Sequence, residues 1–240
     1  MAYRQPRLPN EELTFMTNEE LKEKTIILAS GSARRKEIFE AHGFIPVIRP
    51  MDVDETLPKD IRPEDAVMYL ALKKGLACED AMQGNGRACE DAFDADSKKS
   101  DAFDADSDNA LIVSADTIVY AKDITTGNWC IMGKPKDEDD AWRMLSSIRG
   151  TSHKVMTGVT VICPSVGIRR VFCDTTDVFV DNVSDADLQA YIDSGEPYGK
   201  AGGYAIQLGF GKYIDHIEGD YENVVGFPYE HFVKEMQAVG

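Results

Sequence analysis

The sequence has little of what builds disulfide frameworks, metal sites or membrane spans. Its five cysteines are odd in number and contain no CxxC spacing, so they predict neither a disulfide framework nor a zinc knuckle and suit a reducing compartment. The four histidines show no HxH or HxxxH spacing, which argues against a histidine-built metal site. No stretch approaches the roughly 20 apolar residues of a membrane span, and the opening MAYRQPRLPNEE has no apolar core like that of a signal peptide. We therefore expect a cytoplasmic protein with no membrane contact.

Positive charge is also scarce. The chain has 26 Lys and Arg residues against 42 Asp and Glu residues, for a net charge of −16. Nucleic acid and anionic membranes would be repelled at long range, so broad binding to either is excluded. A small phosphorylated ligand needs only a local basic pocket, which makes neighbouring arginines informative in this chain. GxSxG and Walker A motifs are missing as well, so covalent acyl transfer and P-loop chemistry have no support.

The chain has enough apolar residues to form a full core. With 240 residues, 43% of them apolar, we expect one large domain or two closely joined lobes over residues 25–240, after an N-terminal extension of residues 1–24. An acidic, low-complexity insertion is predicted at about residues 80–109, where the heptad DAFDADS occurs twice. Its DxD spacing is also found in calcium loops, but the required Gly and Glu are missing, so calcium binding is the weaker interpretation.

The stretch 25–43, TIILASGSARRKEIFEAHG, predicts a strand, a tight loop and a helix. A helix N-terminus presents free backbone N–H groups and the positive end of the helix dipole, which together favour a phosphate. Ser30, Ser32, Arg34 and Arg35 would add hydroxyls and two guanidiniums, whose planar forks match phosphate oxygens. The alternative is an ordinary surface helix with Ser32 as its N-cap, ended by Gly43.

Two charged residues fall in apolar patterns. Asp116 lies in the middle of LIVSADTIVY (111–120), the strongest predicted strand, and a buried carboxylate is costly unless it is paired, hydrogen-bonded or bound to a metal. We favour a functional role for Asp116 over the alternative that its carboxylate caps a strand end or turn.

Lys74 lies on the apolar side of a helix that begins at Pro63. It could instead snorkel at the edge of that stripe, and periodicity alone does not separate it from Lys73.

The other elements follow from periodicity, capping and turn residues. A glycine-rich segment, 199–207, is expected to lead into another strand, with its glycines serving either close ligand approach or a bent strand. The expected elements are a helix over 18–24, strands over 44–48 and 129–132, a helix from about 137, a hairpin of 153–163 and 169–181, a helix capped by Ser184, a strand over 213–217, a loop over 219–228 and a final amphipathic helix.

Several separate motifs together resemble one family. They are LASGSARR (28–35), DVDET (52–56), SADTIV (114–119), GKP (133–135), HKVMTGV (153–159), GEPYGKAGGYAIQ (195–207) and GDYENVVGFP (219–228). In this order they resemble the Maf family, also called septum formation proteins or nucleoside triphosphate pyrophosphatases. The resemblance implies an α/β fold with an elongated mixed sheet, flanking helices and two lobes around a central cleft, similar to the inosine triphosphate pyrophosphatases.

The same resemblance implies a reaction and a set of site residues. A nucleoside triphosphate and water would give the monophosphate and pyrophosphate, with a divalent cation. Thr117, Lys134 and Gln207 match positions of members acting on dTTP and UTP, while Gly199 stands where aspartate is usual before Lys200. By position, the catalytic residues would be Asp116, Glu55 and Lys74, and the substrate-binding residues Ser30, Ser32, Arg34, Arg35, Thr117, Lys134, Lys200 and Gln207.

These residues suit metal-assisted hydrolysis of a phosphoanhydride. Glu55 and Asp116 would bind Mg²⁺ or Mn²⁺ through hard oxygen ligands, and Asp116 could position or deprotonate the attacking water. The amide of Gln207 could pair with N3–H and a carbonyl of thymine or uracil. The competing hypothesis is a non-catalytic nucleotide-binding regulator of cell division. The residues leave open whether the chain is a monomer or a homodimer, and whether modified pyrimidine triphosphates are substrates.

Overall fold

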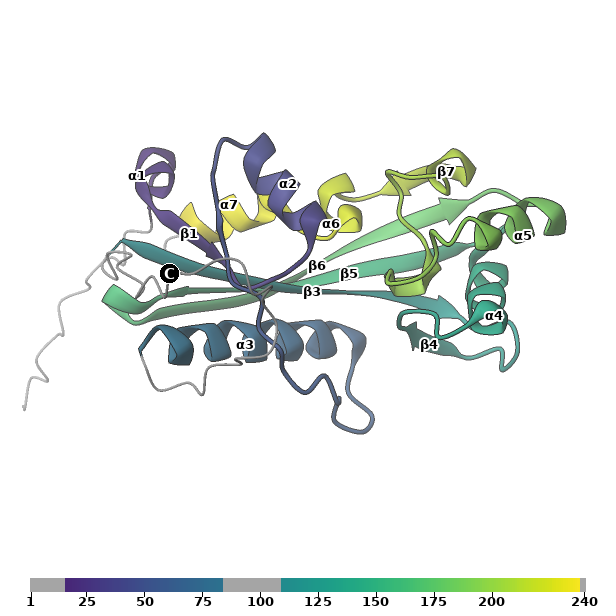
Figure 1. The fold of residues 1–240 in the computed structure, drawn as a ribbon, viewed down its shortest axis with the longest axis horizontal. Helices are drawn as coiled ribbons and strands as arrows, with labels where there is room; N and C mark the ends of the chain where they lie inside the picture. The colour runs from purple at the N-terminus through teal and green to yellow at the C-terminus, as the bar shows by residue number, and fades with distance from the viewer. Residues whose placement is uncertain (1–15, 84–108, 238–240) are drawn as a thin grey trace, which may run out of the picture.

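The computed structural model describes residues 16–83 and 109–237 (Figure 1). The predicted N-terminal extension lies partly outside these ranges, and both copies of the DAFDADS heptad lie wholly outside them. The predicted acidic insertion and the alternative of a calcium site at the heptads therefore concern mainly residues outside the described part of the chain, which includes only the first few residues and the last residue of the predicted insertion.

A seven-stranded mixed sheet forms the centre of the molecule, in the order β2-β1-β3-β5-β6-β7, with β4 added on β3. β1 pairs in parallel with β2 and β3, and every other pairing is antiparallel. This confirms the predicted α/β class with a mixed sheet. The strands are β1 (Thr25–Leu28), β2 (Val47–Ile48), β3 (Ala110–Lys122), β4 (Trp129–Met132), β5 (Ser152–Cys163), β6 (Ile168–Val180) and β7 (Ile214–Glu218).

Strand β3 has a gap in its pairing on one side. Its residues 110–113 pair with β1 and its residues 119–122 pair with β4, while β5 runs along the opposite side from 112 to 120. In the described part of the chain no strand pairs with residues 114–118 on the β1 side. The loop after β1 and the turn after β4 both end beside this gap, so the topology leaves an opening next to Asp116.

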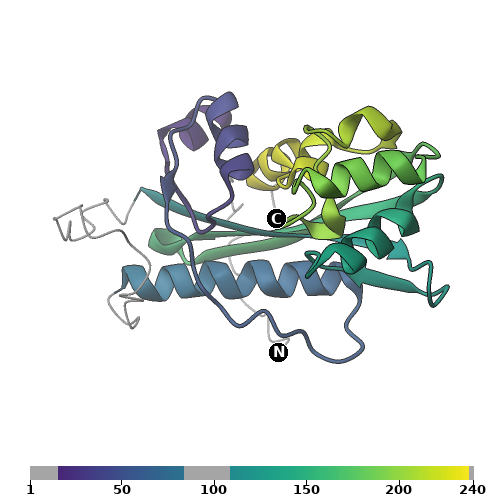
Figure 2. The same cartoon turned by 45° about the vertical axis from the view of Figure 1, so that its right-hand side comes forward.

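Helices cover both faces of the sheet (Figures 1 and 2). The long helix α3 packs on one face against β3 and β5, and α1, α2, α6 and α7 lie on the other face. Helices α4 and α5 lie at the end of the molecule that carries β4. The helices are α1 (Asn18–Glu23), α2 (Ala33–Ala41), α3 (Pro63–Met82), α4 (Glu138–Ile148), α5 (Asp185–Asp193), α6 (Tyr221–Val225) and α7 (Tyr229–Gln237).

The largest apolar clusters divide the molecule into two lobes. One packs the rings of Phe39, Phe227 and Phe232 beneath α2 and α7. The other packs residues such as Leu145 and Phe210 around α4 and α5. Since strand β3 contributes residues to both clusters, the two lobes share one continuous sheet, as expected.

Local sequence signals place most elements correctly. Pro63 is the first residue of α3, and Ser184 caps α5 by accepting a hydrogen bond from the backbone of Asp187. The predicted hairpin forms between β5 and β6 in continuous antiparallel register. Ser32 is the N-cap residue of α2, but its side chain makes no capping hydrogen bond, so its hydroxyl is not committed to the helix.

Two predictions near the C-terminal end are wrong. Segment 199–207 does not run directly into a strand; it forms the 3₁₀ turn η2 (Ala201–Gly203) and further turns, and the next strand, β7, begins only at Ile214. The left-handed backbone at Gly202 (φ 65°) and Gly203 (φ 77°) is incompatible with an extended strand. Segment 219–228 is not simply a loop, because Asp220 caps the one-turn helix α6 through the backbone N–H of Glu222.

The described helices include none with both the length and the apolar character to cross a bilayer.

Candidate active site

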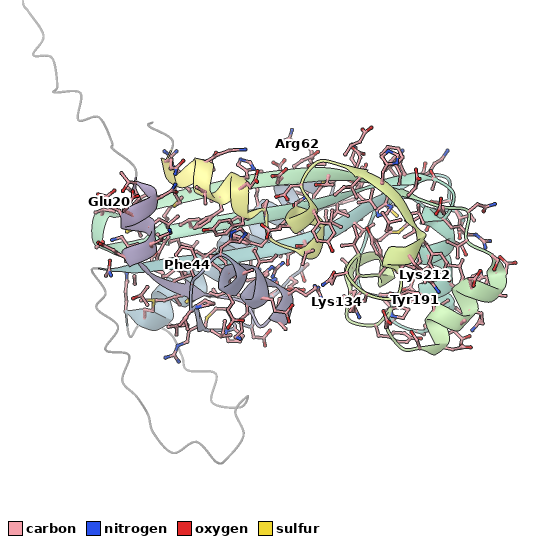
Figure 3. All side chains as sticks on the ribbon, turned by 90° about the horizontal axis from the view of Figure 1, so that it is seen from above. Glu20, Phe44, Arg62, Lys134, Tyr191 and Lys212 are labelled. Atoms are coloured by element: carbon pink, nitrogen blue, oxygen red, sulfur yellow. The ribbon has the colours of Figure 1, made fainter. Side chains whose placement is uncertain are left out.

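A cavity of about 650 Å³ opens at the gap in β3, between the two lobes. In Figure 3, Lys134 lies where the two halves of the molecule meet. The walls come from the loop after β1, the first turn of α2, the segment before α3 that carries Glu55, from α3, β3, the turn after β4, segment 199–207 and the end of α6. They include ten of the eleven predicted site residues: Ser30, Ser32, Arg34, Arg35, Glu55, Lys74, Asp116, Thr117, Lys134 and Gln207.

The ammonium of Lys74 bridges two carboxylates in this cavity. Its Nζ lies 2.7 Å from Asp116 Oδ1 and 2.8 Å from Glu55 Oε1. The side chains of Lys74 and Asp116 are mostly buried, whereas that of Glu55 is half-exposed. The hydrogen bond from Lys74 lowers the pKa of Glu55, against a smaller opposing effect of burial. Pairing with Lys74 thus explains how Asp116 is tolerated in an apolar strand.

Close packing of α3 on the sheet makes this contact geometrically feasible. Ser114 Oγ donates a 2.7 Å hydrogen bond to the carbonyl of Ala71, one helical turn before Lys74. Ser114 and Asp116 are two residues apart on β3 and therefore face the same side, toward α3. Gly158 pairs with Asp116 on the neighbouring strand, and a Cβ there would lie 2.6 Å from the backbone nitrogen of Met68. The absence of a side chain at Gly158 therefore lets the helix approach.

The structure distinguishes the two neighbouring lysines. Lys73 Nζ donates to the backbone carbonyl of Asp54 and lies 5.4 Å from the centre of the Tyr69 ring. Residues one apart on a helix point about 100° away from each other, so only Lys74 faces Asp116. Lys73 therefore snorkels at the edge of the apolar stripe, whereas Lys74 forms ion pairs inside the cavity.

The two arginines after β1 both reach helix α6. Arg34 Nε donates to the carbonyl of Val225 at 3.2 Å, and Arg35 Nε donates to the carbonyl of Gly226 at 2.9 Å. Arg35 also donates through Nη1 to Ser30 Oγ at 2.9 Å and through Nη2 to Thr117 Oγ1 at 3.0 Å. Every guanidinium nitrogen of Arg35 therefore has a protein acceptor.

Arg34 is the freer of the two. In residues 16–83 and 109–237, no acceptor is found for its terminal nitrogens Nη1 and Nη2, which leaves both for a ligand. Burial lowers the pKa of Arg35 to about 10, with Asp116 opposing the shift and Arg34 adding to it. A guanidinium with that pKa is still charged at neutral pH, so the cavity wall carries two adjacent positive charges.

Lys200 is the one predicted site residue that does not line the cavity. Its Nζ donates to the backbone carbonyl of Glu196, although its neighbours Gly199 and Ala201 are part of the wall. Burial, and secondarily the charge of Arg34, lower the pKa of Lys200. Gly199 offers no carboxylate beside Lys200, whose ammonium is held by a backbone carbonyl.

Part of the cavity wall is apolar. Val119, Ile131, Met132 and Tyr204 contribute to it, and the exposed Gln207 also lines the cavity. The Tyr204 hydroxyl lies 2.6 Å from Nε2 of the fully buried His153, and burial lowers the pKa of that histidine to about 3. The imidazole is therefore neutral at physiological pH, and its hydrogen bond holds the Tyr204 hydroxyl in place. Apolar side chains together with one amide in the same wall suit a nucleobase.

Sequence patterns missed the residues that act through the backbone or from the sheet interior. The α6 carbonyls that hold the arginines leave no side-chain signal, and Ser114 and Gly158 are ordinary residues of their strands. Only the GDYENVVGFP motif indicated that the C-terminal segment belongs near the site.

The donor set for a metal is limited to the two carboxylates. Outside residues 1–15, 84–108 and 238–240, the chain has no cluster of three or more His, Cys, Asp or Glu side chains able to hold an ion. Mg²⁺ is commonly bound by one or two carboxylates together with substrate phosphates and water. Glu55 and Asp116 each bond Lys74 through one oxygen and keep a second, which suits an ion that arrives with a polyphosphate.

Comparison with known proteins agrees with the motif-based resemblance. A family model described as "Maf-like protein" matches residues 25–239. A protein of Desulfitobacterium hafniense (strain Y51) named dTTP/UTP pyrophosphatase is 37% identical over 216 residues, covering 90% of this chain and 85% of the relative. A protein of the same name from Caldicellulosiruptor saccharolyticus is 36% identical over 218 residues, which cover 90% of this chain and 96% of the relative. These names describe enzymes and do not favour a non-catalytic regulator.

Proposed function

Because the chain belongs to the Maf family, we propose that it is a nucleoside triphosphate pyrophosphatase acting on dTTP, UTP and modified pyrimidine triphosphates. The observation that carries the proposal is the arrangement of the cavity. A carboxylate pair held by Lys74 lines the same cavity as the two arginines in the first turn of α2, and several apolar side chains complete the wall. The names of its relatives support this activity, and a cysteine content that suits a reducing compartment supports a cytoplasmic location.

In the proposed reaction, the carboxylate of Asp116 takes a proton from water as the water oxygen attacks the α-phosphorus. The bond between the α-phosphorus and its bridging oxygen to the β-phosphate then breaks, and pyrophosphate leaves. Lys74 keeps Asp116 oriented through their 2.7 Å ion pair. The terminal nitrogens of Arg34 and the ammonium of Lys134 would bind the phosphates and offset charge that develops on the leaving group.

Glu55 and Asp116 would hold a divalent cation that enters with the triphosphate. When bound, such an ion neutralises phosphate charge and makes a bound water more acidic. Glu55 keeps one carboxylate oxygen that does not bond Lys74, and this side chain is 53% exposed. That exposure suits a metal ion that arrives and leaves with each substrate, rather than one that stays permanently bound.

A pyrophosphate-release panel tests the proposal. We expect release from dTTP, UTP and 5-substituted uridine triphosphates in the presence of Mg²⁺ or Mn²⁺, and loss of release on addition of a chelator. Purine triphosphates serve as the comparison. Release of orthophosphate in place of pyrophosphate, or no turnover of any triphosphate with either metal, would contradict the proposal.

A Gln207→Glu substitution tests how the base is chosen. The amide has both a donor and an acceptor for the base, whereas a carboxylate only accepts, so one hydrogen bond becomes a repulsion. We expect the preference for dTTP and UTP over other triphosphates, measured as a ratio of kcat/KM values, to fall about tenfold. The ratio controls for repulsion between the new carboxylate and the phosphates. An unchanged ratio would show that Gln207 does not read the base.

A further inference from the structure

A chain of two threonine hydroxyls links Arg35 in the first turn of α2 to helix α6. Arg35 Nη2 donates to Thr117 Oγ1 at 3.0 Å, and Thr117 Oγ1 lies 3.0 Å from Thr157 Oγ1. Thr157 Oγ1 in turn donates to the backbone carbonyl of Asn223 at 3.1 Å. Thr157 and Asn223 are both fully buried, and neither lines the cavity.

The direction of this chain is determined by its two ends. A hydroxyl has one proton, and Thr157 uses its proton at the Asn223 carbonyl, which can only accept. Thr117 must therefore donate to Thr157, which leaves Thr117 with lone pairs for Arg35. Each bond in such a series polarises the next, so the ordered chain strengthens the bond made to Arg35.

Asn223 holds the far end of the chain in place. Its Nδ2 donates to the carbonyl of Val155 at 3.1 Å and to Thr176 Oγ1 at 2.9 Å. These bonds anchor α6 on strands β5 and β6. The same helix end presents the carbonyls of Val225 and Gly226 to the two arginines. The position of α6 thus affects Arg35 twice, through the hydroxyl chain and through the Gly226 carbonyl.

We infer that Thr157 and Asn223 are positioning residues for substrate binding, which hold Thr117 and Arg35, and with them the loop of Ser30–Arg34, in the geometry that binds a polyphosphate. Arg35 acts as a brace in this arrangement, since all its nitrogens have protein acceptors. Arg34 provides the free terminal nitrogens for the ligand. The inference deepens the proposed function, on which it rests for the identity of the substrate.

The principal test is Thr157→Val, which removes the hydroxyl and keeps the side-chain shape. Without its acceptor, the Thr117 hydroxyl has only the Gly226 carbonyl nearby, at 3.5 Å. We expect the affinity for inorganic tripolyphosphate, measured by titration calorimetry, to fall about tenfold. KM for dTTP should rise by a similar factor with kcat nearly unchanged, because the chain supports binding rather than the chemical step. Thr157→Ser restores the hydroxyl and should return both values toward wild type.

A matched control lies on the same strand. Thr160 is also fully buried, but its hydroxyl has no hydrogen-bond partner among the described residues. Thr160→Val should therefore leave tripolyphosphate affinity and KM unchanged. Equal losses in Thr157→Val and Thr160→Val, or no rescue by Thr157→Ser, would show only a general packing effect and would overturn the inference.

The Asn223→Ala variant tests the other end of the chain. If both residues act through Arg35, the double variant Thr157→Val/Asn223→Ala should lose less affinity than the product of the two single losses. Fully multiplicative losses would overturn the inference. Tripolyphosphate binding requires no hydrolysis, so it distinguishes the two proposals: wild-type binding without pyrophosphate release would refute the enzyme and leave the positioning role measurable. No wild-type binding would refute the positioning role.

Discussion

Asp116→Asn should reduce kcat for pyrophosphate release by about 10³-fold, within the usual range for loss of a general base. The amide keeps the size of the carboxylate but cannot accept the proton of the attacking water. It also removes one of the two negative partners of Lys74, leaving only Glu55 at 2.8 Å. The measurement is single-turnover pyrophosphate release from dTTP with Mg²⁺, alongside nucleotide binding by calorimetry.

Asp177→Asn is the matched control for this variant. Asp177 pairs with Lys154 at 2.8 Å on the neighbouring strands β5 and β6, and neither residue lines the cavity. This substitution also breaks a lysine–aspartate pair but should leave kcat close to the wild-type value. If Asp116→Asn retained more than about a tenth of wild-type turnover, Asp116 would not be the base. If the Asp116→Asn variant failed to bind nucleotide, the role of Asp116 would be in substrate binding.

Gly158→Ala is expected to lower the free energy of unfolding by about 3 kcal/mol, at the upper end of overpacking effects. The new Cβ would lie 2.6 Å from the Met68 nitrogen and nearer still to the carbonyl group of Val67. Both atoms belong to the backbone of α3 and cannot rotate away as a side chain could, so the helix must shift. In a chain of this size, the melting temperature should fall by roughly 10 °C.

Urea denaturation of Gly158→Ala beside Gly133→Ala would measure this effect. A Cβ at Gly133 would have no heavy atom within 4 Å, so that variant should unfold like wild type. Because α3 carries Lys74, the shift in Gly158→Ala should also weaken the contact with Asp116 and reduce pyrophosphate release below the melting temperature. A Gly158→Ala protein as stable as Gly133→Ala would show that α3 does not pack against the sheet as described.

Short-range signals in the sequence were sufficient for most elements and for the kind of site. The Pro63 start of α3, the Ser184 cap of α5 and the hairpin of β5 and β6 depend on neighbours within a few residues. The motifs with adjacent arginines and a strand aspartate indicated a phosphate site, and these residues do line one cavity. The signals failed at 199–207, where left-handed glycines form turns instead of leading into a strand.

The sequence by itself determined the class of the fold, the elements with strong local signals and the candidate residues around Asp116. Only the tertiary structure decided which lysine meets Asp116 and that Lys200 lies outside the cavity wall. It also showed that Arg35 braces the loop, whereas the terminal nitrogens of Arg34 have no acceptor among the described residues. The physical reason is the separation of the partners along the chain. Arg35 meets the Gly226 carbonyl across 191 residues, and a backbone acceptor leaves no trace in side-chain patterns, so packing alone brings such groups together.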